Sequence, residues 1–140
     1  MNKDHFYMDL ASLISTQGTC PRLQVGALVV REGRILAIGY NGSPRGDSHC
    51  GCIVDSANHC VKAVHAEANV IANAAFSGTP LKDATLYSTH LPCERCFPLL
   101  VNAGIQRIFY ENEYKNRIST LQHKLIKNIQ KLTKKIVLTT

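Results

Sequence analysis

Apolar and polar positions follow two different periods along the first forty residues. Steps of three and four predict an amphipathic helix over about residues 2–17, ended by Gly18. Two almost continuous apolar runs, 25–30 and 34–40, flank Glu32-Gly33 and predict a β-hairpin. Because neither run has regular polar positions, we expect both strands to be covered on both faces. The apolar stripe of the helix is expected to comprise Phe6, Leu10, Leu13 and Ile14.

The second half of the chain alternates between helical and strand patterns. Apolar residues after His65 recur at helical spacing and stop at Gly78, and a strand is expected over 84–89. A second helix is expected over about 93–103, followed by a strand over 105–110. This alternation predicts an α/β fold in which parallel strands are joined by helical crossovers.

The C-terminal stretch, about residues 115–136, has an apolar stripe at steps of three and four and a Lys-rich opposite face, which predicts a helix. Residues 137–138 would add a last strand. Charge is concentrated here: residues 1–113 hold nine Lys and Arg against ten Asp and Glu, whereas residues 114–140 hold seven Lys and Arg and no acid. A Lys-rich face is usually just solvated, and contact with nucleic acid or an acidic partner is the alternative.

The composition is that of one domain spanning residues 1–140. With 45% apolar residues, a chain of this length can bury its own core. The N-terminus has acids where a signal peptide would be apolar, and no stretch approaches membrane-spanning length. We therefore expect a cytoplasmic protein with no membrane partner. Six Cys residues in that compartment favour metal binding over disulfides.

The most specific chemical signal is a His-x-Glu sequence at His65 and Glu67, followed by a Pro-Cys-x-x-Cys sequence with Cys93 and Cys96. An imidazole and two thiolates suit Zn²⁺, and three protein ligands leave a coordination position open for water. At the start of a helix Glu67 would reach that water while His65 binds the metal. The alternatives are a structural zinc site and a reduced thiol pair, neither of which needs the acid.

A Gly-rich octapeptide, residues 39–46, directly follows the second strand of the hairpin. Glycines let backbone N–H groups approach a ligand, Arg45 offers a fork for phosphate, and Asn41 can bond a sugar hydroxyl. The alternative is a tight turn that needs positive φ.

A second group of metal-ligating side chains lies outside this set. Cys20 precedes the first strand, and Cys50 follows the Gly-rich octapeptide. A structural Zn²⁺ bound by Cys20, Cys50 and one or two of Cys52, His59 and Cys60 would stabilise a loop with little apolar content. Unliganded buried thiols are the alternative.

Taken together, these motifs resemble the deoxycytidylate deaminase family within the zinc cytidine deaminase superfamily. The resemblance covers roughly residues 10–114 and rests on residues 20–27, the octapeptide 39–46, His65 to Glu67 with Asn69, and residues 92–96. It implies a three-layer α/β/α cytidine-deaminase-like fold with a mixed, mostly parallel five-stranded sheet. It also implies hydrolytic deamination of dCMP to dUMP and ammonia, which supplies dUMP for dTTP synthesis.

The resemblance also implies roles for individual residues. His65, Cys93 and Cys96 would be the zinc ligands, and Glu67 would carry protons between water and the pyrimidine. The substrate would be held by Asn41, Ala66 and Arg22. Regulated members use an effector site, matched here by Gly42, Arg45 and Tyr114, where dCTP activates and dTTP inhibits. Such members are commonly hexamers, and some carry a second zinc, matched here by Cys20, Cys50, His59 and Cys60.

Two other classes of function compete with this reading. A tRNA adenosine deaminase or another nucleoside or nucleotide deaminase shares the zinc motifs, and the basic tail slightly favours tRNA. Arg45 in the octapeptide argues instead for a mononucleotide phosphate, so nucleic acid is not the partner we expect. A non-catalytic, zinc-stabilised binding module would have no use for Glu67.

Overall fold

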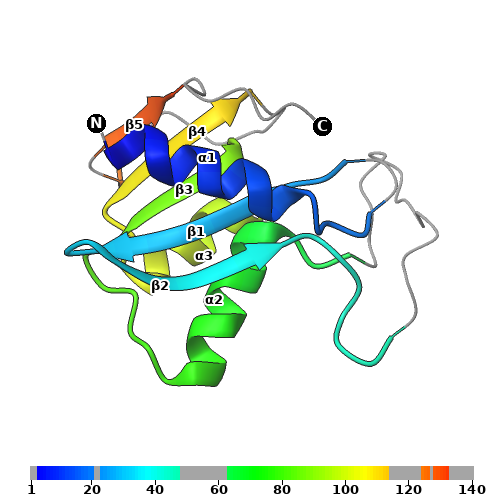
Figure 1. Ribbon diagram of the computed structural model, residues 1–140. Helices are drawn as coiled ribbons and strands as arrows, with labels where there is room; N and C mark the ends of the chain where they lie inside the picture. The colour runs from blue at the N-terminus through cyan, green and yellow to red at the C-terminus, as the bar shows by residue number, and fades with distance from the viewer. Residues whose placement is uncertain (1–2, 21–22, 48–62, 114–123, 127, 133–140) are drawn as a thin grey trace.

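A five-stranded mixed sheet lies between helices on its two faces (Figure 1). The computed structural model describes residues 3–20, 23–47, 63–113, 124–126 and 128–132. The strands are β1 (Gly26–Arg31), β2 (Arg34–Tyr40), β3 (Thr85–His90), β4 (Arg107–Asn112) and β5 (Asn128–Lys131), in the order β2-β1-β3-β4-β5. The helices are α1 (Lys3–Ser15), α2 (Ala66–Ser77) and α3 (Cys96–Ala103). This is the expected three-layer arrangement.

The sheet is mixed, as predicted, and every strand except β1 runs in the same direction. Strand β1 pairs antiparallel with both β2 and β3, whereas β3 with β4 and β4 with β5 are parallel. The two-residue turn at Glu32-Gly33 accounts for the first antiparallel pair. Its residues have φ of 53° and 75°, the left-handed pair that matches the twist of a hairpin.

The continuous apolar run of β1 is explained by helices on both faces of the sheet. Ala27 and Val29 face the core under α2 and α3, whereas Leu28 and Val30 face the core under α1. Residues of β3 and β4 alternate in the same way. The core under α2 and α3 also contains Val70, Ala74, Leu86, Phe97, Leu100 and Ile108, and the core under α1 contains Tyr7, Met8, Tyr87 and Phe109.

The buried face of α1 matches the predicted stripe only in part, because Leu10 and Ile14 pack against the core under α1 but the other two residues are exposed. Phe6 and Leu13 are 44% and 53% exposed, and the residues buried against the sheet include Tyr7, Met8 and Ala11. Aromatic side chains on the sheet decide this rotation. The Tyr7 ring lies 5.1 Å from that of Tyr87, which in turn stacks on Phe109 at 5.2 Å.

Strand β2 lies at the edge of the sheet, so the prediction that it is covered on both faces was wrong. Ile35, Ile38 and Tyr40 are between 41% and 48% exposed. Helix α2 nevertheless contacts this strand closely. The Nδ2 atoms of Asn69 and Asn73 donate to the main-chain oxygens of Tyr40 and Ile38 at 2.8 and 2.7 Å, which satisfies polar groups of the strand.

The predicted C-terminal helix over about 115–136 was wrong where the structure describes the chain. Residues 128–131 form β5, which extends the sheet beside β4. Ile126 and Leu132, on either side of this strand, are 3% and 8% exposed and join opposite cores. Residues 114–123 and 133–140, including the strand expected at 137–138, lie outside the described residues. No helix in the described part of the chain is long and apolar enough to span a membrane.

Candidate metal centre

The start of α2 carries the His-x-Glu sequence, as predicted. His65 is the N-cap residue with extended backbone angles of φ −69° and ψ 154°, and Glu67 lies in the first turn. The helix ends at Gly78, whose φ of 70° is the left-handed conformation that glycine adopts at helix ends. His65 therefore lies just before the first residue of α2, whereas Glu67 lies inside the helix.

Helix α3 begins at Cys96, three residues later than predicted. Cys93 therefore lies in the loop after β3, and its carbonyl accepts a hydrogen bond from the N–H of Phe97 at 3.0 Å. That bond has helical i to i+4 spacing, so the two sulfurs keep neighbouring positions. The C-cap residue of α3 is Gly104, with a φ of 92°.

The donor atoms of His65, Cys93 and Cys96 converge. His65 Nδ1 lies 3.4 Å from each sulfur, and the three donor atoms all lie within 4.8 Å of one another. Tetrahedral zinc, with bonds of about 2.05 Å to nitrogen and 2.3 Å to sulfur, separates such ligands by roughly 3.6 Å. Both cysteines are buried. The three residues are positioned to bind a metal ion, and their chemistry and spacing fit zinc.

Electrostatics within this group favours a thiolate. The pKa of the Cys93 thiol is lowered, because Cys96 and then His65 donate hydrogen bonds to its sulfur. The pKa of Cys96 is raised, because its proton is shared with Cys93. The hydrogen bond with Cys93 raises the pKa of His65. The thiolate is the form of cysteine that binds metals.

Glu67 is a buried carboxyl group next to these donors. It is 4% exposed, and burial raises the pKa of its carboxyl above the ordinary value. The charge of His65 and a hydrogen bond from Ser88 act in the opposite direction. The Ser88 hydroxyl donates to Glu67 Oε1 at 3.0 Å. Sequence reasoning missed Ser88, although a serine shortly before the Pro-Cys motif, in a strand whose end leads to Cys93, could have indicated it.

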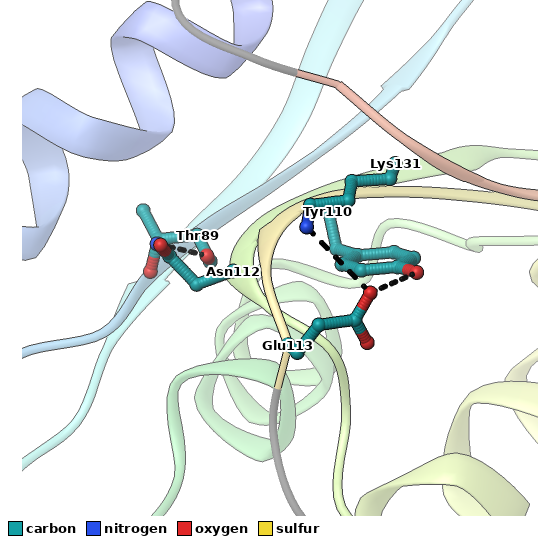
Figure 2. A network of polar contacts seen from close by, with 5 residues as sticks. All are labelled: Thr89, Tyr110, Asn112, Glu113 and Lys131. Atoms are coloured by element: carbon teal, nitrogen blue, oxygen red, sulfur yellow. Dashed lines mark hydrogen bonds and ion pairs between the residues drawn. The ribbon is translucent and has the colours of Figure 1, made fainter.

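The end of β3, from which the Cys93 loop departs, is fixed by polar contacts with its neighbours. Thr89 Oγ1 accepts the N–H of Gly26 from β1 at 3.2 Å. Asn112 Nδ2 donates to the main-chain oxygen of Thr89 at 2.9 Å (Figure 2). The same figure shows Glu113 between Tyr110 and Lys131, which connects the ends of β4 and β5.

The Gly-rich octapeptide leads from β2 toward the metal centre. Gly42 forms an antiparallel bridge with Val64, the residue before His65. Asn41 is buried, and its side chain accepts the N–H of Val25 at 2.8 Å and donates to the oxygen of Leu23 at 2.6 Å. Both hydrogen bonds attach the octapeptide to the residues just before β1.

Gly39 in this octapeptide has a packing role that sequence reasoning did not identify. A Cβ at this position would lie 2.5 Å from the oxygen of Ala66 and 2.7 Å from the nitrogen of Val70. The first glycine of the motif therefore lets α2, with its metal-binding start, approach β2.

The other expected site residues are placed in part. Ala66 is fully buried at the start of α2, and the exposed Arg45 guanidinium lies 5.0 Å from the centre of the Phe76 ring. Cys20 is buried. Six further residues lie outside the described residues and stay predictions: Arg22, Cys50, Cys52, His59, Cys60 and Tyr114.

The chain is similar in sequence to a family model and to curated proteins. A sequence model described as the cytidine and deoxycytidylate deaminase zinc-binding region matches residues 1–112. ComE operon protein 2 of Bacillus subtilis is 40% identical over 115 residues, covering 80% of this chain and 60% of that protein. The deoxycytidylate deaminase of Saccharomyces cerevisiae is 35% identical over 133 residues, covering 89% of this chain and 42% of the yeast protein. The chain thus spans less than two thirds of these relatives.

Solved structures agree with the sequence relatives. The dCMP deaminase of cyanophage S-TIM5, crystallised in complex with dCMP and dUMP, superposes with a TM-score of 0.81 at 34% identity. The match covers 93% of this chain and 96% of the phage enzyme. The similarity therefore includes the whole arrangement of sheet and helices.

Proposed function

The chain belongs to the cytidine and deoxycytidylate deaminase family, and from this premise we propose that it hydrolyses dCMP to dUMP and ammonia. The observation that carries the proposal is the buried Glu67 carboxyl beside the three converging donor atoms of His65, Cys93 and Cys96. A structural zinc site gains nothing from an additional buried acid, whose desolvation costs free energy.

Each residue of the centre has a distinct task in this reaction. His65, Cys93 and Cys96 would hold zinc, which would supply the Lewis acidity that makes water nucleophilic near neutral pH. The Glu67 carboxylate accepts a proton from the attacking water. It returns that proton to N3 of the cytosine ring, and it then transfers the second proton of the same water, from the new hydroxyl group on C4, to the departing amine, so that water and dCMP become dUMP and ammonia.

Substrate recognition would come from the segments next to the centre. The bridge between Gly42 and Val64 brings the neighbouring Asn41 close to the segment that enters the metal-binding helix. The hydrogen bonds of Asn41 with Leu23 and Val25 preorganise its amide, and its remaining N–H can bind the deoxyribose. The N–H groups that begin α2 at Ala66 can bind the pyrimidine carbonyl. Arg22 would bind the substrate phosphate.

Regulation and assembly complete the proposal. Gly42, Arg45 and Tyr114 would bind the effectors, with dCTP activating and dTTP inhibiting. The exposed guanidinium of Arg45 supports this role, because it can turn from Phe76 toward a phosphate. We expect a cytoplasmic homo-hexamer, with a second, structural zinc bound by Cys20, Cys50, His59 and Cys60.

The direct test is ammonia release by the zinc-loaded protein. The substrates are dCMP, CMP, deoxycytidine, dCTP and a tRNA anticodon stem-loop, and dCMP is assayed with and without dCTP or dTTP. We expect turnover of dCMP alone, increased by dCTP and decreased by dTTP. Turnover of the stem-loop but not of dCMP would replace the proposal with tRNA deamination, and no turnover of any substrate would refute it.

A further inference from the structure

Ser88 is a buried polar side chain on the core face of the sheet. It lies in β3 between Ala27 of β1 and Tyr110 of β4, and it is 0% exposed. Because side chains alternate along a strand, Ser88 shares a face with Leu86, which packs in the core under α2 and α3. A hydroxyl buried there costs free energy unless it is hydrogen-bonded.

The hydrogen bonds of Ser88 have a definite direction. A hydroxyl group has one hydrogen to donate and can accept others. The main-chain N–H of His90 donates to Ser88 Oγ at 3.4 Å, and Ser88 Oγ donates to Glu67 Oε1 at 3.0 Å. The strand therefore presents its hydroxyl hydrogen to one oxygen of the Glu67 carboxylate.

We infer that Ser88 is a positioning residue that fixes the Glu67 carboxylate for proton transfer. A glutamate on a helix has three side-chain torsions, and burial alone does not select one orientation of its carboxylate. With Oε1 bound by Ser88, rotation of the carboxylate is restricted, and Oε2 is the oxygen that exchanges protons in the proposed reaction. This role rests on the proposed function, since it concerns the proton carrier of that reaction.

The size of the effect follows from the precision that proton transfer needs. A misplacement of about 1 Å can cost on the order of 10²-fold in rate, and loss of a supporting hydrogen bond at a metal centre typically costs about 10–100-fold. Ser88→Ala is expected to lower kcat for dCMP by about 10–100-fold. KM and zinc content are expected to stay close to those of the wild type, because Ser88 is not one of the three donor residues.

Thr89 offers a matched control on the next residue. Its hydroxyl is also buried, but it accepts the N–H of Gly26 and bonds His90 Nδ1 rather than Glu67. Thr89→Val removes a hydroxyl at nearly constant volume. It is expected to lower Tm, since loss of one hydrogen bond costs roughly 1 kcal/mol of stability, and to lower kcat less than Ser88→Ala does.

A double-mutant cycle distinguishes an effect on the orientation of Glu67 from a general loss of fold stability. Ser88→Ala is measured alone and in the Glu67→Gln background, with kcat, KM, zinc content and Tm for each variant. If Ser88 acts through Glu67, its substitution changes kcat by less than about threefold in that background. Equal losses in both backgrounds, or an unchanged kcat in Ser88→Ala alone, would overturn the inference.

A crystal structure of Ser88→Ala gives a readout that does not depend on turnover. We expect the Glu67 carboxylate to rotate or to occupy more than one conformation, with the donor atoms of the metal centre in place. A single, unchanged Glu67 conformation would overturn the inference. If the wild type does not turn over dCMP, the proposed function fails, and this structural comparison still decides whether Ser88 orients Glu67.

Discussion

Gly39→Ala should weaken zinc binding, although Gly39 is not a metal ligand. The added Cβ would lie 2.5 Å from the oxygen of Ala66, which is 0.9 Å short of the ordinary 3.4 Å contact. Both close contacts are main-chain atoms of α2, so the helix has to move as a unit. Its N-cap is His65, and metal sites tolerate ligand displacements of only about 0.2 Å.

Two magnitudes follow from this displacement. Overpacking of a well-packed contact typically costs about 1–3 kcal/mol of unfolding free energy. Disturbed support of a metal ligand typically costs about 10–100-fold in metal affinity. We therefore expect Gly39→Ala to lose both stability and zinc affinity, measured by urea unfolding at fixed zinc concentration and by competition with a chromogenic chelator.

Gly33→Ala is the matched control in the same hairpin. Its added Cβ meets nothing within 4 Å, but its φ of 75° is strained for alanine and costs roughly 1–2 kcal/mol. The two variants should thus lose similar stability and differ in zinc affinity. If Gly39→Ala binds zinc as tightly as Gly33→Ala, the reasoning that α2 transmits the clash to the metal centre is refuted.

Four further outcomes are expected. Glu67→Gln keeps its zinc and its fold but loses at least ~10²-fold in kcat, with Glu32→Gln at the exposed hairpin tip as the control for the same chemical change. Cys93→Ser, or removal of zinc by a chelator, abolishes ammonia release and lowers Tm, because a metal that binds only the folded state stabilises it by about 2.7 kcal/mol at 100 times Kd. Tyr87→Phe removes the hydroxyl that donates to Asp4 Oδ1 at 2.5 Å and lowers the unfolding free energy by about 1 kcal/mol, which urea unfolding measures; an unchanged midpoint contradicts this. Burial lowers the pKa of His90 below its ordinary 6.5, so the unfolded chain binds that proton first as pH falls, and the contribution of His90 to stability decreases below about pH 6.5. His90→Asn should decrease less steeply over that range in urea unfolding, and equal slopes would exclude His90 as the cause.

Local sequence signals identified the parts of the fold that depend on neighbouring residues. Glu32-Gly33 predicted the hairpin turn, because few residue pairs tolerate two positive φ angles. Gly78 predicted the end of α2 for the same kind of reason. The spacing of Cys93 and Cys96 predicted two sulfurs on one side of a turn, and both lie 3.4 Å from His65 Nδ1.

Tertiary structure decided what depends on partners distant in sequence. The stretch that contains Ile129 has the apolar spacing of a helix, yet it forms β5 because the edge of β4 offers main-chain hydrogen bonds. The apolar character of β2 predicted burial, but its position at the sheet edge leaves Ile38 exposed.

The same division applies to the metal centre. Sequence by itself determined the metal-binding and acidic side chains, because His65, Glu67, Cys93 and Cys96 are a chemical set with a characteristic spacing. Only the tertiary structure placed Ser88 against Glu67 and Gly39 against α2. The physical reason is that a ligand set depends on residue type and local spacing, whereas orientation and close packing depend on which strands lie beneath the helix.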